Sequence, residues 1–324
     1  MWTVFEMDMP EHVITGAHGF IGSRLGLFLE KRCKPYVPIT YDTGMGGILD
    51  RGRLLRLFKD KSVVFHLGAI SGSKFFDDLS VATRVNCEGT ANVLEAARVN
   101  DVGTVVFAST SSCYAFGPVP HREEDPPKAI NSYVATKLYG EYLMKLFADL
   151  YGIRTVIMRF GSVYGIGEGR KGSVANPVTQ FLNTMLEGRY PLVYGKGKQK
   201  RDLIFADDVA EALFLASWSA AIKPGDIYNV ATGTPISFNK VIELIGKVLK
   251  THIKPMYVPY PKNKYQTKYI EIQYLDTSKF RAIGWAPKVG LEEGLKRIVA
   301  SKTGHAKSFL ARDVTKNYMA LEHI

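Results

Sequence analysis

The chain has 324 residues, of which 46% are hydrophobic and 23% charged. This composition supports a large buried core and excludes wholesale disorder. No apolar run reaches the length of about 18 residues that a transmembrane helix needs, and the N-terminal segment lacks the pattern of a secretory signal. The three cysteines are scattered, which argues against a disulfide framework. We therefore expect a cytoplasmic protein with no membrane partner.

The formal charge of +11 comes from 42 basic and 31 acidic residues. Such a surplus suits nucleic acid or an anionic small molecule, and the alternative is a solvated basic surface. No nucleic-acid module signature occurs, and the histidines and cysteines show no metal-ligand spacing. We expect neither a nucleic-acid partner nor a metal.

Short apolar segments alternate with amphipathic segments through the first half of the chain. Strands are predicted at 12–15, 38–41, 63–67, 104–108 and 155–160, and helices at 20–31, 53–59, 81–98 and 132–151. Strands without polar alternation that are separated by helices predict a doubly wound parallel sheet, covered by helices on both faces.

The regular alternation of apolar and amphipathic segments ends after residue 164, where a glycine-rich, charged loop begins. The second half predicts helices at 177–187, 237–249 and 291–300, strands at 191–194 and 227–231, and a strand that runs into a helix at 203–216. The predicted organisation is an α/β protein with a Rossmann-type domain at 1–165, onto which 202–230 packs back. A smaller α/β substrate-binding domain takes 166–201 and 231–300, and 301–324 form a C-terminal tail.

Three glycines, Gly16, Gly19 and Gly22, lie between the first predicted strand and the first predicted helix. Glycines at this spacing allow a tight turn and the close approach of a pyrophosphate to a helix N-terminus. Asp42 ends the second predicted strand, where a carboxylate could bind the ribose hydroxyls, and no basic residue follows it at 43–47. This pattern predicts a site for NAD rather than NADP; the alternative is a turn needed only for packing.

Tyr133 and Lys137 are four residues apart on a predicted helix and therefore share one face. Pairs with the same spacing at 194–198 and 260–264 contain glycine or proline, which do not suit a helix interior. A lysine ammonium about 4 Å from a phenol favours its ionised form and could lower its pKa from about 10 toward neutrality. We expect this pair to act in acid–base chemistry; the alternative is an exposed helix pair.

Several segments together resemble one enzyme family, the extended short-chain dehydrogenases/reductases, and within it the sugar-nucleotide epimerase/dehydratase group. They are TGAHGFIG (15–22), VVFHLGA (63–69), VNCEGTANVLEAA (85–97), ASTSSCYAFG (108–117), NSYVATK (131–137), RFGSVYG (159–165) and KRDLIFADDVAEA (200–212). The resemblance spans roughly residues 12–300 and is specific for the family, though not for one substrate.

The resemblance implies a catalytic set of Thr110, Tyr133 and Lys137. Dehydratases and decarboxylases carry carboxylates directly after the Ser/Thr position, whereas this chain has Ser111 and Ser112 there. Epimerisation needs only the hydride relay, so it is the activity that the resemblance favours.

The resemblance also implies the residues that contact the two ligands. For the cofactor NAD they are Gly16, Gly19, Phe20, Ile21, Gly22, Asp42, Ile48, Leu67, Ala69, Asn86, Ser109, Tyr133, Lys137 and Phe160. For a nucleotide-sugar substrate they are Ser111, Ser162, Lys171, Asn176, Arg201 and Tyr265.

Three departures from the family pattern bear on these expectations. The third strand of the family has no room after Asp42, Gly47 stands where the family has an aspartate near adenine, and Ser162 replaces an asparagine. We expect the missing strand to be one at the edge of the sheet, where its loss is tolerated.

The interpretation that these observations favour is an isomerase: an NAD-dependent nucleotide-diphosphate-sugar epimerase acting at C4 of a UDP-hexose. One alternative is an ADP-heptose 6-epimerase, which RKGSVANPVTQFLN (170–183) and PYPKNKYQ (259–266) resemble and in which Lys171 would be an acid–base residue. A sugar-nucleotide dehydrogenase and a non-catalytic NAD-binding protein are also compatible with these motifs. The resemblance further implies a homodimer formed through the helices at 81–98 and 132–151.

Overall fold

The computed structural model describes residues 11–40, 47–72, 74–168, 175–260 and 270–303. Its centre is a six-stranded sheet of order β2-β1-β3-β4-β5-β9 in which every neighbouring pair is parallel. The strands are β1 (His12–Thr15), β2 (Tyr36–Ile39), β3 (Val63–His66), β4 (Thr104–Thr110), β5 (Arg154–Phe160) and β9 (Asp226–Val230). The predicted Rossmann-type parallel sheet is confirmed.

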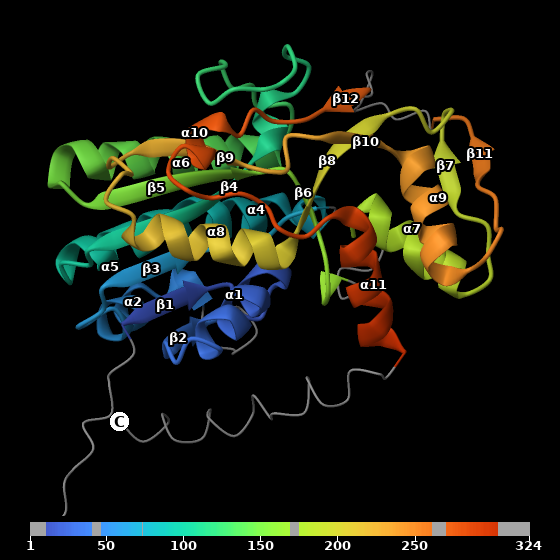
Figure 1. The fold of residues 1–324 in the computed structure, drawn as a ribbon. Helices are drawn as coiled ribbons and strands as arrows, with labels where there is room; N and C mark the ends of the chain where they lie inside the picture. The colour runs from blue at the N-terminus through green and yellow to red at the C-terminus, as the bar shows by residue number, and fades with distance from the viewer. Residues whose placement is uncertain (1–10, 41–46, 73, 169–174, 261–269, 304–324) are drawn as a thin grey trace, which may run out of the picture.

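Helices cover both faces of this sheet (Figure 1). The helices α1 (Phe20–Glu30) and α8 (Ala206–Trp218) lie side by side on one face. The other face is covered by α2 (Arg51–Leu57), α5 (Gly89–Val99) and α6 (Ser132–Tyr151). Strand side chains alternate between the two cores, because Val106 and Ala108 join the α8 side while Val105 and Phe107 join the α6 side.

The predicted helix over 81–98 is interrupted. It consists of α4 (Leu79–Thr83), a π-helical turn at Arg84–Glu88 and α5, and it is preceded by the short helix α3 (Lys74–Asp77). In the turn, the Asn86 side chain bonds the backbone of Ile70 and the hydroxyl of Thr136, and Thr90 donates to the Asn86 carbonyl. These bonds tie the turn to its neighbours, in line with the frequent occurrence of π-bulges at functional sites.

The second strand lies two residues earlier than predicted, because its pairing with β1 runs from His12↔Tyr36 to Thr15↔Ile39. Among the described residues no strand pairs with the outer edge of β2, which agrees with the expected loss of the family's third strand. Such an edge also accommodates Pro38, which cannot donate to a ladder. The described chain resumes with a 3₁₀ turn at Gly47–Leu49.

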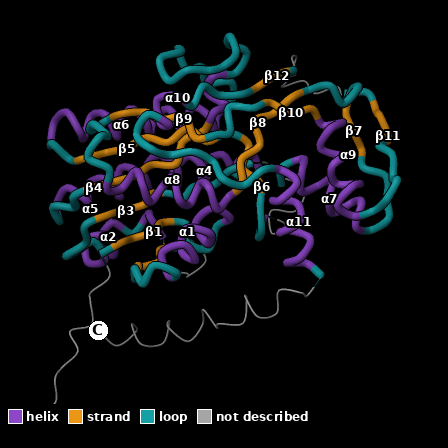
Figure 2. Tube along the Cα trace, viewed as in Figure 1, coloured by secondary structure: helices purple, strands orange, loops and turns teal. Residues whose placement is uncertain are grey.

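The C-terminal half forms a second, smaller group of elements (Figure 2). The strands β6 (Ser162–Tyr164), β8 (Lys200–Phe205), β10 (Pro235–Ser237) and β12 (Ile272–Gln273) form one sheet, and β7 (Leu192–Tyr194) pairs with β11 (Met256–Val258). The helices α7 (Pro177–Leu186), α9 (Phe238–Leu249) and α11 (Leu291–Lys302) enclose a separate core with β7 and β8. The strands β6, β10, β11 and β12 have two or three residues each, too few to show a sequence period.

Three segments from the second half pack on the central sheet. They are α8, β9 and the short helix α10 (Ser278–Arg281), which contacts β9. Phe280 and Trp285 join the core beneath α8, so this part of 231–300 lies with the sheet rather than with the substrate-binding elements to which the sequence pattern assigns it. Among the described helices, none combines the length and apolar character needed to cross a membrane.

Candidate functional site

The glycine turn connects β1 to α1 at the carboxyl edge of the parallel sheet. Gly16 has a φ of +70°, and a Cβ there would lie 2.8 Å from the backbone of Gly68. A Cβ on Gly22 would lie 2.2 Å from the Gly16 carbonyl oxygen, and Gly19 precedes α1 without a side-chain cap. The turn therefore brings the backbone and the N-terminus of α1 to this edge of the sheet, which fits the pyrophosphate of a dinucleotide.

The strand β3 supplies the next wall of this site. Leu67 and Ala69 follow the strand directly and are half-buried. His66 is buried between the hydroxyls of Thr15 (2.8 Å) and Thr90 (2.9 Å). Burial, together with the nearby Lys137 ammonium, lowers the pKa of His66 to about 3, so its ring stays neutral and acts as a structural link.

Other residues expected at the cofactor are held by the fold itself. The side chain of Ile48 packs against the backbone of Gly89, and that of Phe160 joins the core on the α8 side. Asn86 is engaged as described above, and Ser109 donates to Glu141 at 2.5 Å. Phe20 and Ile21 form the first turn of α1. Their contacts with NAD stay predictions. Asp42, Lys171 and Tyr265 lie outside the described residues.

The three candidate catalytic residues come from β4 and α6. Thr110 ends β4 and accepts a hydrogen bond from the Ser112 backbone at 3.2 Å. Tyr133 is in the first turn of α6, whose N-terminus is capped by Asn131, and it packs against a buried cluster that includes Cys113 and Tyr114 just after Thr110. Lys137, one turn later, donates from Nζ to the Ala108 carbonyl at 2.8 Å. The three residues therefore lie at one edge of the sheet.

The charge state of the pair differs from the expectation. The Tyr133 ring contacts Phe75 edge-on, and burial raises the pKa of the phenol to about 12. Burial also lowers the pKa of Lys137 to about 8. The prediction that the pairing lowers the Tyr133 pKa is wrong for this structure, because desolvation disfavours the phenolate and the ammonium is bound to Ala108.

Four polar residues lie close together next to the end of β4. Ser111, Ser162, Asp202 and Gln273 line a narrow gap that leaves no room for a water molecule. Gln273 of β12 donates to the Ser111 carbonyl at 3.1 Å, so β12 brings an amide next to the catalytic strand. Gln273 escapes sequence analysis because only the pairing of β12 with β8 places it there.

The residues expected at a diphosphate lie farther along the second sheet. Arg201 on β8 is half-buried, with its guanidinium carbon 5.7 Å from the centre of the Phe238 ring. Burial lowers the Arg201 pKa, and Tyr260 is the neighbour that opposes this. Tyr260 stacks on Tyr194 at 6.4 Å between ring centroids. Phe238 and Tyr260 are thus aromatic neighbours of Arg201, and the sequence patterns identify neither Tyr194 nor Tyr260 as a binding residue.

Asn176 has a structural task. It caps α7 by accepting from the Val178 backbone at 3.0 Å, and its amide nitrogen donates to the Val163 carbonyl. Its contact with a substrate stays a prediction. Within the part of the chain that the structure describes, no group of three or more His, Cys, Asp or Glu side chains could hold a metal ion.

The amino-acid sequence of residues 12–231 matches the model of the NAD dependent epimerase/dehydratase family. The chain belongs to this family. NAD is the cofactor of the family, and the glycine turn fits it. The family resemblance of the sequence motifs is confirmed.

Relatives and solved structures agree with this membership. A putative UDP-glucose 4-epimerase of Methanocaldococcus jannaschii is 32% identical over 246 residues, which cover 75% of this chain and 77% of the relative. The structure of a UDP-N-acetylglucosamine 4-epimerase from Methanobrevibacter ruminantium in complex with UDP-N-acetylmuramic acid is 25% identical, with a TM-score of 0.84 and coverage of 92% and 100%. A Thermus thermophilus UDP-glucose 4-epimerase in complex with NAD is 29% identical, with a TM-score of 0.78 and coverage of 90% and 99%.

Proposed function

We propose that this epimerase-family protein inverts C4 of a UDP-hexose through a transient keto-sugar. The observation that carries the proposal is the grouping of Thr110, Tyr133 and Lys137 at one sheet edge, with Ser111 and Ser112 where dehydratases and decarboxylases carry acids. The similarity to proteins named as UDP-sugar 4-epimerases supports the choice of base and carbon.

In this mechanism each catalytic residue has one task. NAD held at the glycine turn of Gly16, Gly19 and Gly22 would supply the hydride chemistry at the sugar carbon. The Tyr133 phenolate takes the proton of the sugar hydroxyl, and Thr110 donates a hydrogen bond to the same oxygen. Because burial raises the Tyr133 pKa to about 12, the phenolate depends on positive charge nearby, which Lys137 provides from the adjacent helical turn. Inversion requires the keto-sugar to turn so that it is reduced on its opposite face, after which Tyr133 returns the proton to the sugar oxygen.

The aromatic surroundings of Arg201 suit a nucleoside diphosphate. A guanidinium can bind a diphosphate through two hydrogen bonds, and the stacked rings of Tyr194 and Tyr260 offer a surface for a planar base. We assign the nucleotide half of the substrate to these residues, and the motifs predict that Asn176, Lys171 and Tyr265 also contact the substrate. The sugar then extends along β8 toward Ser162, Ser111 and Gln273.

The experiment that tests the proposal is incubation of the protein and NAD with UDP-glucose, UDP-N-acetylglucosamine, UDP-glucuronate and an ADP-heptose, followed by NMR of the sugars. Inversion at C4 of a UDP-sugar supports it and identifies the substrate. Inversion only at C6 of the heptose overturns it in favour of a 6-epimerase that uses Lys171. Net release of NADH indicates a dehydrogenase, and bound NAD without any turnover indicates a non-catalytic binder.

Removing the guanidinium should separate binding from chemistry. Arg201→Leu is expected to raise the KM for the nucleotide sugar by about 10- to 100-fold, the loss of a charged hydrogen-bonded contact, while kcat falls much less. Steady-state kinetics measure both. Arg189→Leu is the matched control, because Arg189 is exposed and pairs only with the exposed Glu187 among the described residues. An equal effect of both substitutions would contradict the assignment.

We also propose a cytoplasmic homodimer. Val99 of α5 and Tyr139, Tyr142, Leu150 and Tyr151 of α6 are exposed. Arg98 lies over the Tyr151 ring at 5.1 Å, so the two helices present these side chains together. Light scattering during size-exclusion chromatography should give twice the mass of one chain for the wild type. For Tyr142→Glu it should give the mass of a single chain. The cysteines Cys33, Cys87 and Cys113 are unpaired, which fits a reducing compartment.

A further inference from the structure

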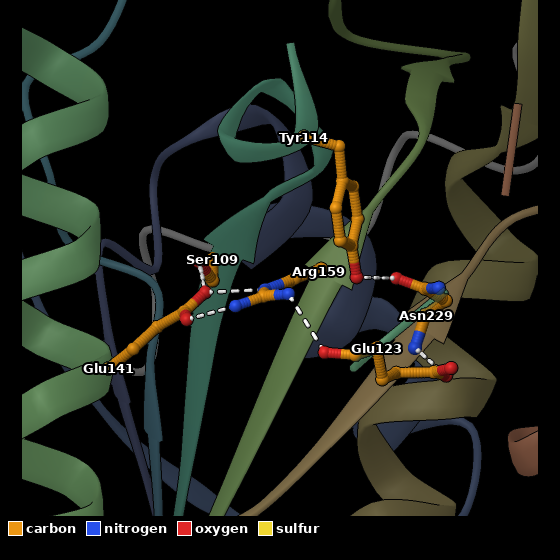
Figure 3. Close-up of polar contacts among 6 residues, drawn as sticks. All are labelled: Ser109, Tyr114, Glu123, Glu141, Arg159 and Asn229. Atoms are coloured by element: carbon orange, nitrogen blue, oxygen red, sulfur yellow. Dashed lines mark hydrogen bonds and ion pairs between the residues drawn. The ribbon is translucent and has the colours of Figure 1, made fainter. Parts of the chain in front are cut away.

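A buried ion pair lies beneath the catalytic end of β4, and the mechanism above does not use it. Arg159 of β5 is 1% exposed and Glu141 of α6 is 4% exposed. Arg159 donates to both carboxylate oxygens, from Nε at 2.9 Å and from Nη2 at 2.6 Å. The Ser109 hydroxyl donates to the same carboxylate at 2.5 Å (Figure 3). A carboxylate from the catalytic helix is therefore bound by two adjacent strands.

The sequence positions explain why these groups meet. Ser109 and Arg159 are direct partners in the β4–β5 register, and both lie in phase with Val105, Phe107 and Ile157, which face α6. On α6, the residues Tyr133, Lys137 and Glu141 follow one another at intervals of four and share a face. The helix thus presents a phenol, a cation and an anion in order along the end of β4.

The side of the Arg159 guanidinium that faces away from Glu141 also has interaction partners. Its guanidinium lies over the Tyr114 ring at 4.8 Å and reaches the Glu123 carbonyl at 3.4 Å. Tyr114 donates to Asn229 at 2.7 Å, and Asn229 donates to the carbonyl of Asp276, three residues from Gln273 (Figure 3 shows the first of these contacts). The ion pair is the centre of a network that joins β4, α6, β5 and β9.

Stability alone does not account for such a pair. Desolvating two charges costs about as much as their attraction returns, and apolar residues of similar volume commonly serve as well. Glu141 has a second neighbour whose charge matters, because Lys137 is 5% exposed and lies one helical turn away. Burial lowers the pKa of Lys137 to about 8, and the Glu141 carboxylate opposes this lowering.

We propose that Glu141 is a positioning residue for the reaction: its carboxylate keeps Lys137 cationic and fixes the end of β4 against α6, so that Thr110 and Tyr133 reach the same sugar hydroxyl. The inference rests on the proposed function. The titratable and charged groups around the carboxylate and Lys137 are Tyr133 on α6, His66 on β3, Arg159 on β5, and Cys113 and Tyr114 after β4.

The direction of the pH effect follows from the charges. Lys137 must be protonated, so kcat falls as the pH rises through the Lys137 pKa. Removing the neighbouring carboxylate lowers that pKa, so the fall begins at lower pH. For Glu141→Gln we expect the alkaline limb of the kcat profile to move down by about one pH unit or more. A pKa lowered by one unit from about 8 leaves about half of Lys137 protonated at pH 7, so kcat there should fall about twofold or more while KM changes less than about threefold.

Two controls separate charge from shape. Glu141→Asp keeps the charge on a shorter side chain, so kcat should fall while the alkaline limb stays at the wild-type pH. Ser109→Ala removes one hydrogen bond to the carboxylate but keeps its charge, so the alkaline limb of this variant should also stay at the wild-type pH. A Glu141→Gln enzyme whose kcat falls equally at every pH would overturn the proposal and leave Glu141 a structural residue.

If Glu141→Gln does not fold, the pair Glu141→Leu with Arg159→Met removes both charges and commonly preserves stability. For this double variant we again expect the alkaline limb of the kcat profile to lie at lower pH than in the wild type. A limb at the wild-type pH overturns the proposal. The wild-type protein is assayed alongside. An inactive wild type would mean that the proposed function fails, whereas an active wild type with an unchanged limb in the variant overturns this inference alone.

Discussion

Replacing Lys137 with methionine is expected to abolish turnover and to leave the fold intact. The ammonium is buried and makes its described hydrogen bond to the Ala108 carbonyl. Methionine fills a similar volume without a charge to desolvate, so the core should tolerate it. Burial raises the Tyr133 pKa to about 12, and without the ammonium no positive charge remains one helical turn away to stabilise the phenolate during the reaction. We expect kcat to fall by about 10³-fold or more, toward the upper end of what acid–base catalysis contributes.

Turnover measured by NMR and thermal unfolding measured by circular dichroism together check this prediction. Lys145→Met is the matched control, because Lys145 lies on the same helix and is exposed. The control should keep both activity and Tm. A Lys137→Met protein that retains a tenth or more of the wild-type kcat would show that this lysine is not needed, whereas an unfolded one would assign it a structural task.

The sequence correctly predicts the elements whose structure is determined by residues close to one another along the chain. The strand at 12–15, the three glycines after it and the helix at 132–151 are all found as expected, because each combines a clear period with a cap or a turn. The parallel sheet follows from them, since apolar strands joined by helices have few other arrangements.

The remainder depends on distant parts of the chain. Gln273 reaches the catalytic strand only through a two-residue strand that pairs with β8. The pKa of Tyr133 is governed by burial, which requires Phe75 and the Ser111–Tyr114 turn to be in place. Glu141 is an intermediate case. Its spacing of four from Lys137 is visible in the sequence, but its partner Arg159 becomes evident only when β5 lies beside β4.

The two halves of the site meet because β5 continues into β6 almost without interruption. Gly161 separates them, and a Cβ there would lie 3.0 Å from Ala231 Cβ and 3.1 Å from the Asp202 carbonyl oxygen. The chain therefore leaves the nucleotide-binding sheet and enters the second sheet within one residue. This short passage places Ser162 of β6 and Asp202 of β8 beside Ser111, the residue that follows Thr110.

Adding one methyl group at Gly22 is expected to remove the ability to bind NAD. A Cβ at this position would lie 2.2 Å from the Gly16 carbonyl oxygen and 2.9 Å from Ala17 Cα. Both obstacles are backbone atoms, so no side-chain rotation relieves the overlap and the turn itself must move. The turn would present the α1 N-terminus to the pyrophosphate, so we expect Gly22→Ala to weaken NAD binding by about 100-fold or more and to cost about 1–3 kcal/mol of stability.

Calorimetric titration with NAD and thermal unfolding without it measure the two effects separately. Gly52→Ala is the matched control, because Gly52 lies in α2 and a Cβ there would come no closer than 3.6 Å to another group. This control should bind NAD normally and change the stability by no more than about 1 kcal/mol. If Gly22→Ala bound NAD as tightly as the control, the cofactor would not depend on the glycine turn, because a turn displaced by a methyl group could not hold its phosphates in the same way.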